Sequence, residues 1–131
     1  MNLTEKIHEA LEMTSDDSRA FYNVSSGEIV WLNEYIEGYE ELAEEIDNNF
    51  ENYIPLPTKY DINEYSMMRD FAKGYPDSEV SSRLCRAVSG RGAFRYFKDS
   101  VYDMGIEQEW FAFRDGEYKK IAEAWRKEHN I

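Results

Sequence analysis

The side chains with the clearest chemical potential lie between positions 83 and 98, where five basic residues occur without an acidic one. They are Arg83, Arg86, Arg91, Arg95 and Lys98. The chain as a whole has 131 residues and a formal charge of −12, so a segment of charge +5 is a candidate anion-binding site. At its centre, residues 89–95 (Ser-Gly-Arg-Gly-Ala-Phe-Arg) predict a turn into a helix. Free backbone N–H groups at a helix N-terminus favour an anion.

Three interpretations of this basic stretch stay open. The arginines pair within the chain, with the acidic helical face of residues 40–47 or with Asp99 four residues after Arg95, or they are simply solvated. Alternatively, they bind carboxylates of an acidic peptide or protein. In the third interpretation the ligand is a phosphate, a nucleotide or an RNA backbone. The overall negative charge of the chain would repel such a ligand. Tyr96 adds an exposed aromatic ring beside Arg95, a composition typical of protein contact sites.

The usual sequence signatures of catalytic sites are missing. The two histidines, His8 and His129, lie near the ends of the chain, and no metal-binding, nucleophile-elbow or phosphate-loop motif is present. Cys85 is expected to be a half-buried filler, although Arg83 and Arg86 beside it would lower the pKa of a reactive thiol. The sequence therefore predicts no catalytic residue, no metal and no cofactor. An enzyme that uses carboxylates, tyrosines or Cys85 is the remaining alternative.

Charge divides the chain into two subregions of one predicted domain, 1–131. Residues 1–57 contain fourteen acidic and two basic side chains, whereas residues 58–131 contain thirteen of each. The segment Pro55-Leu56-Pro57 marks the change, because two prolines so close together forbid a helix there. Residues 1–57 are expected to form an acidic helix–hairpin–helix subregion, and residues 58–131 a helical one.

Hydrophobic spacing predicts the elements of the first subregion. A short helix follows Asn2, a hairpin joins residues 20–24 to residues 28–32, and Tyr53–Leu56 is a third, edge strand. Asn33 is predicted to cap a second helix. The buried stripe of that helix would consist of Ile36, Tyr39, Ala43, Ile46 and Phe50.

The second subregion reads as four helices with short connections. They begin near Asp61, Ser78, Ala93 and Glu107, and Gly116 marks a possible break in the last of them. Phe94 and Phe97 are expected to be buried together in the third helix. The predicted fold class is α+β and mainly helical, with a small N-terminal antiparallel β element packed on a C-terminal bundle of about four helices.

Composition narrows the location of the protein. The longest wholly apolar run, Ile29–Leu32, has four residues, far fewer than the roughly 20 that a membrane span needs. The first twelve residues carry three glutamates and no apolar core, unlike a signal peptide. A single cysteine excludes an internal disulfide. We therefore expect a cytoplasmic protein without a membrane partner.

Several segments resemble the bacterial group known as uncharacterised protein family 0158. They are residues 22–30, 53–57, 90–99 and 110–115 and the pattern Ala122-x-x-Trp125. The resemblance covers about residues 20–131, supports the fold interpretation and implies no activity. Tyr96 stands where the family leads us to expect a second arginine, which weakens the phosphate interpretation.

The functional hypothesis that follows is a non-enzymatic cytoplasmic interaction or regulatory domain. Its candidate partner- or anion-binding residues are Arg83, Arg86, Arg91, Arg95, Tyr96 and Lys98. The partner would be an acidic protein or a second copy of the chain. Binding of phosphate or nucleic acid at the turn of residues 90–95 is the alternative.

Overall fold

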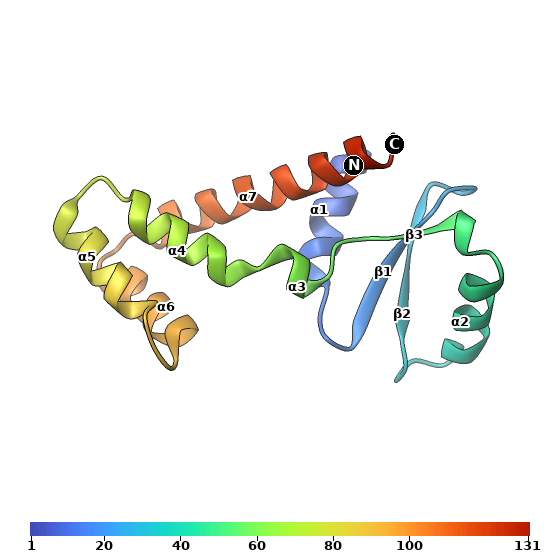
Figure 1. The fold of residues 1–131 in the computed structure, drawn as a ribbon, viewed down its shortest axis with the longest axis horizontal. Helices are drawn as coiled ribbons and strands as arrows, with labels where there is room; N and C mark the ends of the chain where they lie inside the picture. Colours follow the sequence, from blue (N-terminus) through green and yellow to red (C-terminus); the bar gives the residue numbers. More distant parts are fainter. The chain divides into compact units, whose positions relative to one another are not determined.

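The computed structural model describes all residues from Met1 to Ile131, and the chain forms two compact units (Figure 1). The sheet unit comprises Met1–Ile62 together with Tyr118–Ile131, and the helical unit comprises Asn63–Glu117. The mixed α+β, mainly helical fold is confirmed, with a small antiparallel sheet near the N-terminus. That the 131 residues form one domain stays a prediction.

The elements follow one another in the order expected from the sequence, with one additional short helix. The sheet unit contains α1 (Leu3–Met13), β1 (Ser18–Asn23), β2 (Glu28–Asn33), α2 (Tyr39–Asn48), a 3-10 turn (Phe50–Asn52), β3 (Tyr53–Pro55) and α3 (Lys59–Ile62). The helical unit contains α4 (Glu64–Gly74), α5 (Ser78–Ala87) and α6 (Ala93–Asp103). The long helix α7 (Glu107–Glu128) supplies its first half to the helical unit and its second half to the sheet unit.

The sheet has the strand order β2-β1-β3, and β1 is antiparallel to both neighbours. Because β1 is central, it is buried on both faces. Phe21 packs with Ile46 of α2 and with Tyr53, while Tyr22 points to the opposite face and meets the Trp125 ring edge-on at 5.9 Å. Figure 1 shows α1 and α2 on opposite sides of the strands. The expected hairpin and edge strand are thus confirmed.

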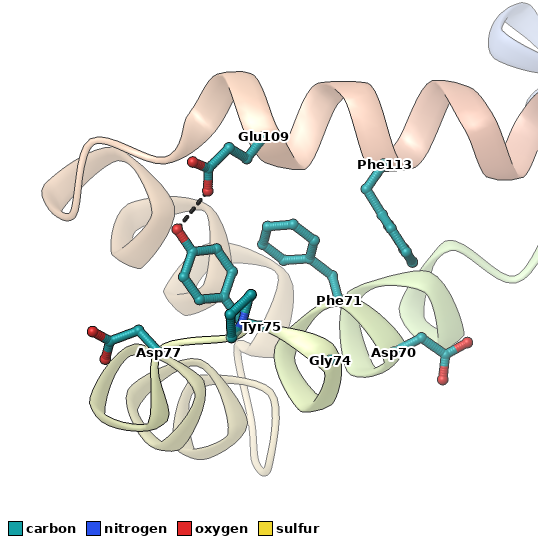
Figure 2. Close-up of a pocket in the computed structure, with 8 residues that line it drawn as sticks. Asp70, Phe71, Gly74, Tyr75, Asp77, Glu109 and Phe113 are labelled. Atoms are coloured by element: carbon teal, nitrogen blue, oxygen red, sulfur yellow. Dashed lines mark hydrogen bonds between the residues drawn. The ribbon is translucent and has the colours of Figure 1, made fainter.

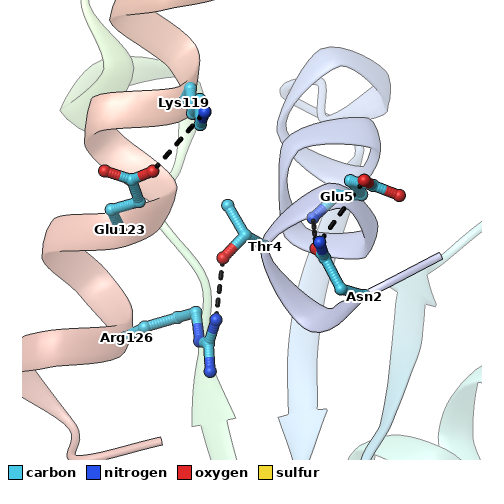
Figure 3. A network of polar contacts seen from close by, with 6 residues as sticks. All are labelled: Asn2, Thr4, Glu5, Lys119, Glu123 and Arg126. Carbon is cyan, nitrogen blue, oxygen red and sulfur yellow. Dashed lines mark hydrogen bonds and ion pairs between the residues drawn. The ribbon is translucent and has the colours of Figure 1, made fainter.

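The end of α7 is fastened to the sheet unit by polar contacts. The Trp125 indole Nε1 donates to the carbonyl of Pro55 at 3.0 Å. The Arg126 guanidinium donates to the Thr4 hydroxyl at 2.8 Å (Figure 3). It also donates to the carbonyl of Ile131. One side chain of α7 therefore holds both the start of α1 and the final residue of the chain.

An aromatic cluster forms the core of the helical unit. Phe71 of α4 lies 6.1 Å from Phe97 of α6 and 5.5 Å from Trp110 of α7 between ring centroids, and Phe97 lies 4.8 Å from Trp110. All three pairs meet edge to face, the favourable geometry for aromatic rings. Removing these rings from water supplies most of the driving force for the three helices to converge.

Side-chain caps fix several helix starts. Asn2 accepts from the backbone N–H of Glu5 at 2.9 Å, as predicted, and Asp77 accepts from the two N–H groups that open α5. The helix expected to begin near Asp61 begins at Glu64 instead, because Asn63, in a left-handed conformation, caps α4 after the separate short helix α3.

Two sequence expectations about packing are wrong. Asn33 does not cap α2, which begins six residues later after Gly38, and Ile36 and Phe50 of the expected stripe are exposed. The Asn33 side chain instead accepts from Tyr35 N–H and donates to the Ser18 hydroxyl, which closes the end of the hairpin. Phe94 is not buried with Phe97, since 48% of it is exposed.

No helix in the chain combines the length and the apolar character that crossing a membrane requires.

Candidate binding surfaces

The basic stretch lies on α5, on the turn after it and on α6, and all five of its cations are exposed. Two of them have acidic partners in the helical unit. Arg83 pairs with Asp103 at 3.4 Å, and Arg95 pairs with Asp99 at 3.9 Å, as the four-residue spacing predicted. Both pairs are solvent-exposed, so each contributes at most about 1 kcal/mol. They offset part of the positive charge at little energetic gain.

The other three cations, Arg86, Arg91 and Lys98, have no hydrogen bond or ion pair in the structure. They extend from the last turn of α5 to the second turn of α6. A cation without a partner gives up only water when it meets an incoming anion, because no internal contact has to break. We call these three residues, with Arg95 and Tyr96, the basic surface.

Backbone geometry explains the glycine at position 92. Gly92 has a φ of +71° and precedes α6 without any side-chain cap. A Cβ atom at Gly92 would lie only 3.3 Å from the Tyr96 ring. The ring therefore rests over the glycine at the start of the helix. This contact packs the exposed Tyr96 side chain against the turn.

Hydrogen bonds and ring contacts anchor the turn from beneath. The Tyr65 hydroxyl donates to the carbonyl of Val88 at 2.6 Å, and its ring lies 6.3 Å from that of Phe94. The Ser89 hydroxyl donates to the carbonyl of Cys85. These contacts fix the backbone of the loop that carries Arg91 to the end of α5 and to Tyr65 of α4.

Cys85 is half-buried on α5, as the sequence predicted. Its Sγ atom forms no hydrogen bond, and neither histidine lies in the helical unit to act as a base for it. The arrangement supplies no activated nucleophile at this position.

A hollow of about 520 Å³ in the helical unit was missed by the sequence analysis (Figure 2). It lies between α4, the connection to α5 and the first turns of α7. Its lining residues are Asp70, Phe71, Gly74, Tyr75, Pro76, Asp77, Glu109 and Phe113. The spacing of Glu109 and Phe113 places both on one face of α7. Nothing in sequence spacing relates that face to Tyr75, 34 residues earlier.

Tyr75 and Glu109 form the polar part of this hollow. The Tyr75 hydroxyl donates to the Glu109 carboxylate, and this bond raises the pKa of Tyr75 above its ordinary value of 10.0. The phenol therefore stays protonated at neutral pH and serves as a donor rather than as a base. With aromatic walls and carboxylates at its rim, the hollow is chemically suited to a cation that carries an apolar part.

Comparison with known proteins agrees with the resemblance seen in the sequence. No significant match was found among curated proteins or among solved structures. A family model, described as Uncharacterised protein family (UPF0158), matches residues 1–131 and so includes the first helix as well as the segments noted above. The family description carries no activity that could assign a role to the basic surface or to the hollow. The chain therefore belongs to Uncharacterised protein family (UPF0158).

Proposed function

We propose that this protein is a non-enzymatic interaction domain that binds an acidic segment of a partner protein through its basic surface. The observation that carries the proposal is that three exposed cations without side-chain partners, Arg86, Arg91 and Lys98, occur in the same stretch as the exposed Tyr96. Arginine and tyrosine are the residue types that contribute most to protein interfaces.

The chemistry of the surface favours carboxylates over phosphates as ligands. The turn presents separate arginines on a helix–turn–helix junction, and it lacks the glycine-rich strand-to-helix loop that wraps a phosphate. An acidic side chain can approach each cation from solvent and form a charge-assisted hydrogen bond, while Tyr96 and Phe94 supply apolar contact. Binding of phosphate or nucleic acid at residues 90–95 is the alternative, and self-association through an acidic region of a second copy is a further form of the same chemistry.

The remaining features of the proposal concern its setting. A cytoplasmic location fits the composition, with one cysteine and no membrane-spanning helix, and the family resemblance implies a bacterial source. A carboxylate-binding role also fits the sparse catalytic chemistry, since the hollow at Tyr75 is lined by a protonated phenol and carboxylates and contains no histidine, cysteine or serine.

The test measures binding of a fluorescein-labelled deca-glutamate peptide by fluorescence anisotropy, with a single-stranded RNA of similar charge as the competing ligand. The double variant R91E/R95E should weaken peptide binding at least about tenfold, a loss of about 1.4 kcal/mol. The matched control K59E/K73E changes the net charge by the same amount at exposed lysines outside the basic surface, and it should retain most of the affinity.

Stability must be measured on the same variants. The melting temperature of R91E/R95E should be nearly that of the wild type, because the lost Arg95–Asp99 pair is exposed and weak. A large fall in melting temperature would show that the arginines serve the fold instead. Tighter binding of RNA than of peptide, with a steep salt dependence, would favour the nucleic-acid alternative.

A further inference from the structure

The outer edge of β2 has no strand beside it. β2 is an edge of the sheet and pairs only with β1. In an antiparallel strand, part of the N–H and C=O groups point away from the neighbouring strand. No helix, turn or side chain forms a hydrogen bond with the backbone of Ile29, Val30, Trp31 or Leu32 from the outer side. The central part of this edge is therefore open.

The two edges of the sheet differ in how they are protected. β3 is only three residues long and contains Pro55, which has no N–H to offer a new strand, and the Pro55 carbonyl is occupied by Trp125. β2 runs six residues in unbroken register with β1 and contains no proline, lysine or bulge. These are among the devices with which proteins blunt an exposed edge, and the only charged residue within β2 is Glu28 at its start.

A groove accompanies the open edge. It lies between α1 and β2 in the sheet unit and encloses about 240 Å³. Its apolar lining includes Ala10 and Met13 of α1 and Ile29 and Trp31 of β2, and Met13 is 63% exposed. Ile29 and Trp31 are two residues apart and therefore point to the same face of the sheet. A strand added beside β2 would direct every second side chain into this groove.

Charge indicates what kind of strand would fit. The sheet unit contains 17 acidic and 7 basic side chains, a net charge of −10. Glu28 and Glu34 stand at the two ends of β2, and Glu9 and Lys6 both line the groove, so the excess of negative charge lies at the ends of the strand. A second copy of the chain would bring the same charges together, whereas a basic segment would meet opposite charges at both ends.

We propose that β2 accepts an extended, basic segment of a partner protein as a fourth strand of the sheet. Main-chain hydrogen bonds to the open edge supply affinity, and the groove between α1 and β2 selects apolar side chains at alternate positions. Lysine or arginine at the ends of the segment pairs with Glu28 and Glu34. This surface is distinct from the basic surface of the helical unit and has the opposite charge preference.

The test uses the full chain and the peptide Lys-Val-Thr-Val-Thr-Val-Lys, with binding followed by calorimetry and amide chemical shifts. Two further peptides carry N-methyl groups on one or the other alternate set of residues. Only one set can face β2, so one methylated peptide should lose at least about tenfold in affinity and the other should bind as the parent does. The shifts should concentrate on residues 28–33 and on the groove.

Matched variants distinguish the contribution of the groove to binding from general effects of charge and exposed apolar surface. M13N removes an exposed apolar side chain of the groove and should weaken binding severalfold. F50N removes one of similar exposure elsewhere in the sheet unit and should leave binding unchanged. R91E/R95E should also leave it unchanged, so that failure here and failure of the proposed function are distinguishable.

Three results would overturn the proposal. The first is the absence of saturable binding at about 1 mM peptide. The second is equal affinity for both methylated peptides. The third is dimerisation of the chain through β2 in the absence of peptide.

Discussion

Single residues at the turn before α6 decide how the basic surface is presented. Gly92 adopts a conformation that side chains disfavour, and the Tyr96 ring lies against it. Gly90, two residues earlier, has an ordinary φ and open space where a Cβ would be. Gly90 and Gly92 thus have different roles in the turn. The sequence alone does not distinguish them.

Replacing each glycine by alanine should separate these roles. Gly92→Ala should lower the free energy of unfolding by about 1–2 kcal/mol, because a left-handed conformation costs that much for a residue with a Cβ. The tyrosine ring must also move. Gly90→Ala should be neutral or slightly stabilising, since it restricts the unfolded chain without a clash. Urea denaturation followed by tryptophan fluorescence measures both, and an equal loss for the two variants would contradict the argument.

Asp61 gives a pH-dependent prediction. Hydrogen bonds from the backbone N–H of Thr58 and from its hydroxyl lower the pKa of Asp61 below 3.8, and the charge of Arg19 adds a smaller contribution. A carboxyl with a lowered pKa stabilises the fold above its unfolded value and loses that effect as the pH falls through its folded value. Carbon-detected titration of Asp61 should place its midpoint below 3.8.

The matched variant for this titration is Asp61→Asn, which keeps the shape of the side chain but removes its charge. Its stability should fall less steeply than that of the wild type as the pH drops from about 5 to about 2. Identical acid profiles for the two proteins would show that the Thr58–Asp61 bonds do not contribute to stability.

Sequence reasoning at this scale identified exposed cations correctly but misjudged some apolar residues. The basic residues were predictable, because a charged side chain without a partner stays in water wherever its helix lies. Phe94 was not predictable in the same way. It lies at the border of the buried face of α6, where its exposure depends on the neighbouring helix. Here that helix is α4, whose Tyr65 ring lies beside the Phe94 ring.

Secondary-structure elements were predicted most reliably where local chemistry alone fixes them. The helix after Asn2, the hairpin and the starts of α5 and α7 follow from spacing and turn residues. Asn33 failed because an asparagine between a strand and a helix can serve either, and its pairing with Ser18 depends on the opposite strand of the hairpin. The hollow beside Tyr75 was equally inaccessible, since three separate elements create it.

Gly116 offers a test of the continuity of α7. The helix passes through this position without a break, and a Cβ at Gly116 would meet open space. Gly116→Ala should therefore raise the free energy of unfolding by up to about 1 kcal/mol. The reciprocal change Ala124→Gly, at another exposed position of α7, should lower it by a similar amount. Thermal melts followed by circular dichroism measure both, and a neutral Gly116→Ala would indicate that the helix needs flexibility there.

At the scale of the whole molecule, the composition of the units was not predictable from charge. The change in charge at residue 57 lies close to the boundary at residue 62, but no local pattern indicates that residues 118–131 return to the sheet unit. Their place depends on long-range contacts of Trp125 and Arg126 with Pro55 and Thr4. Such pairings become visible only in three dimensions.

Truncation after Glu117 should therefore disrupt the sheet unit. The Trp125 side chain, which packs on Tyr22, and the Arg126 hydrogen bonds would be lost together. The dispersed amide signals of residues 18–33 should collapse in an NMR spectrum, while those of α5 and α6 persist. Removal of Ile131 alone is the control and should preserve the sheet. Intact sheet signals in the truncated chain would refute the role assigned to the end of α7.

The return of residues 118–131 to the sheet unit also bears on the order in which the protein is built during translation. All of the helical unit, a contiguous stretch of 63–117, is synthesised before the last piece of the sheet unit. Domains commonly fold in order of synthesis, N-terminal first, but here the N-terminal strands must wait for the latest residues. In the nascent chain, Tyr22 and the Pro55 carbonyl remain without Trp125 until then. The unit that begins first is thus the one that is completed last.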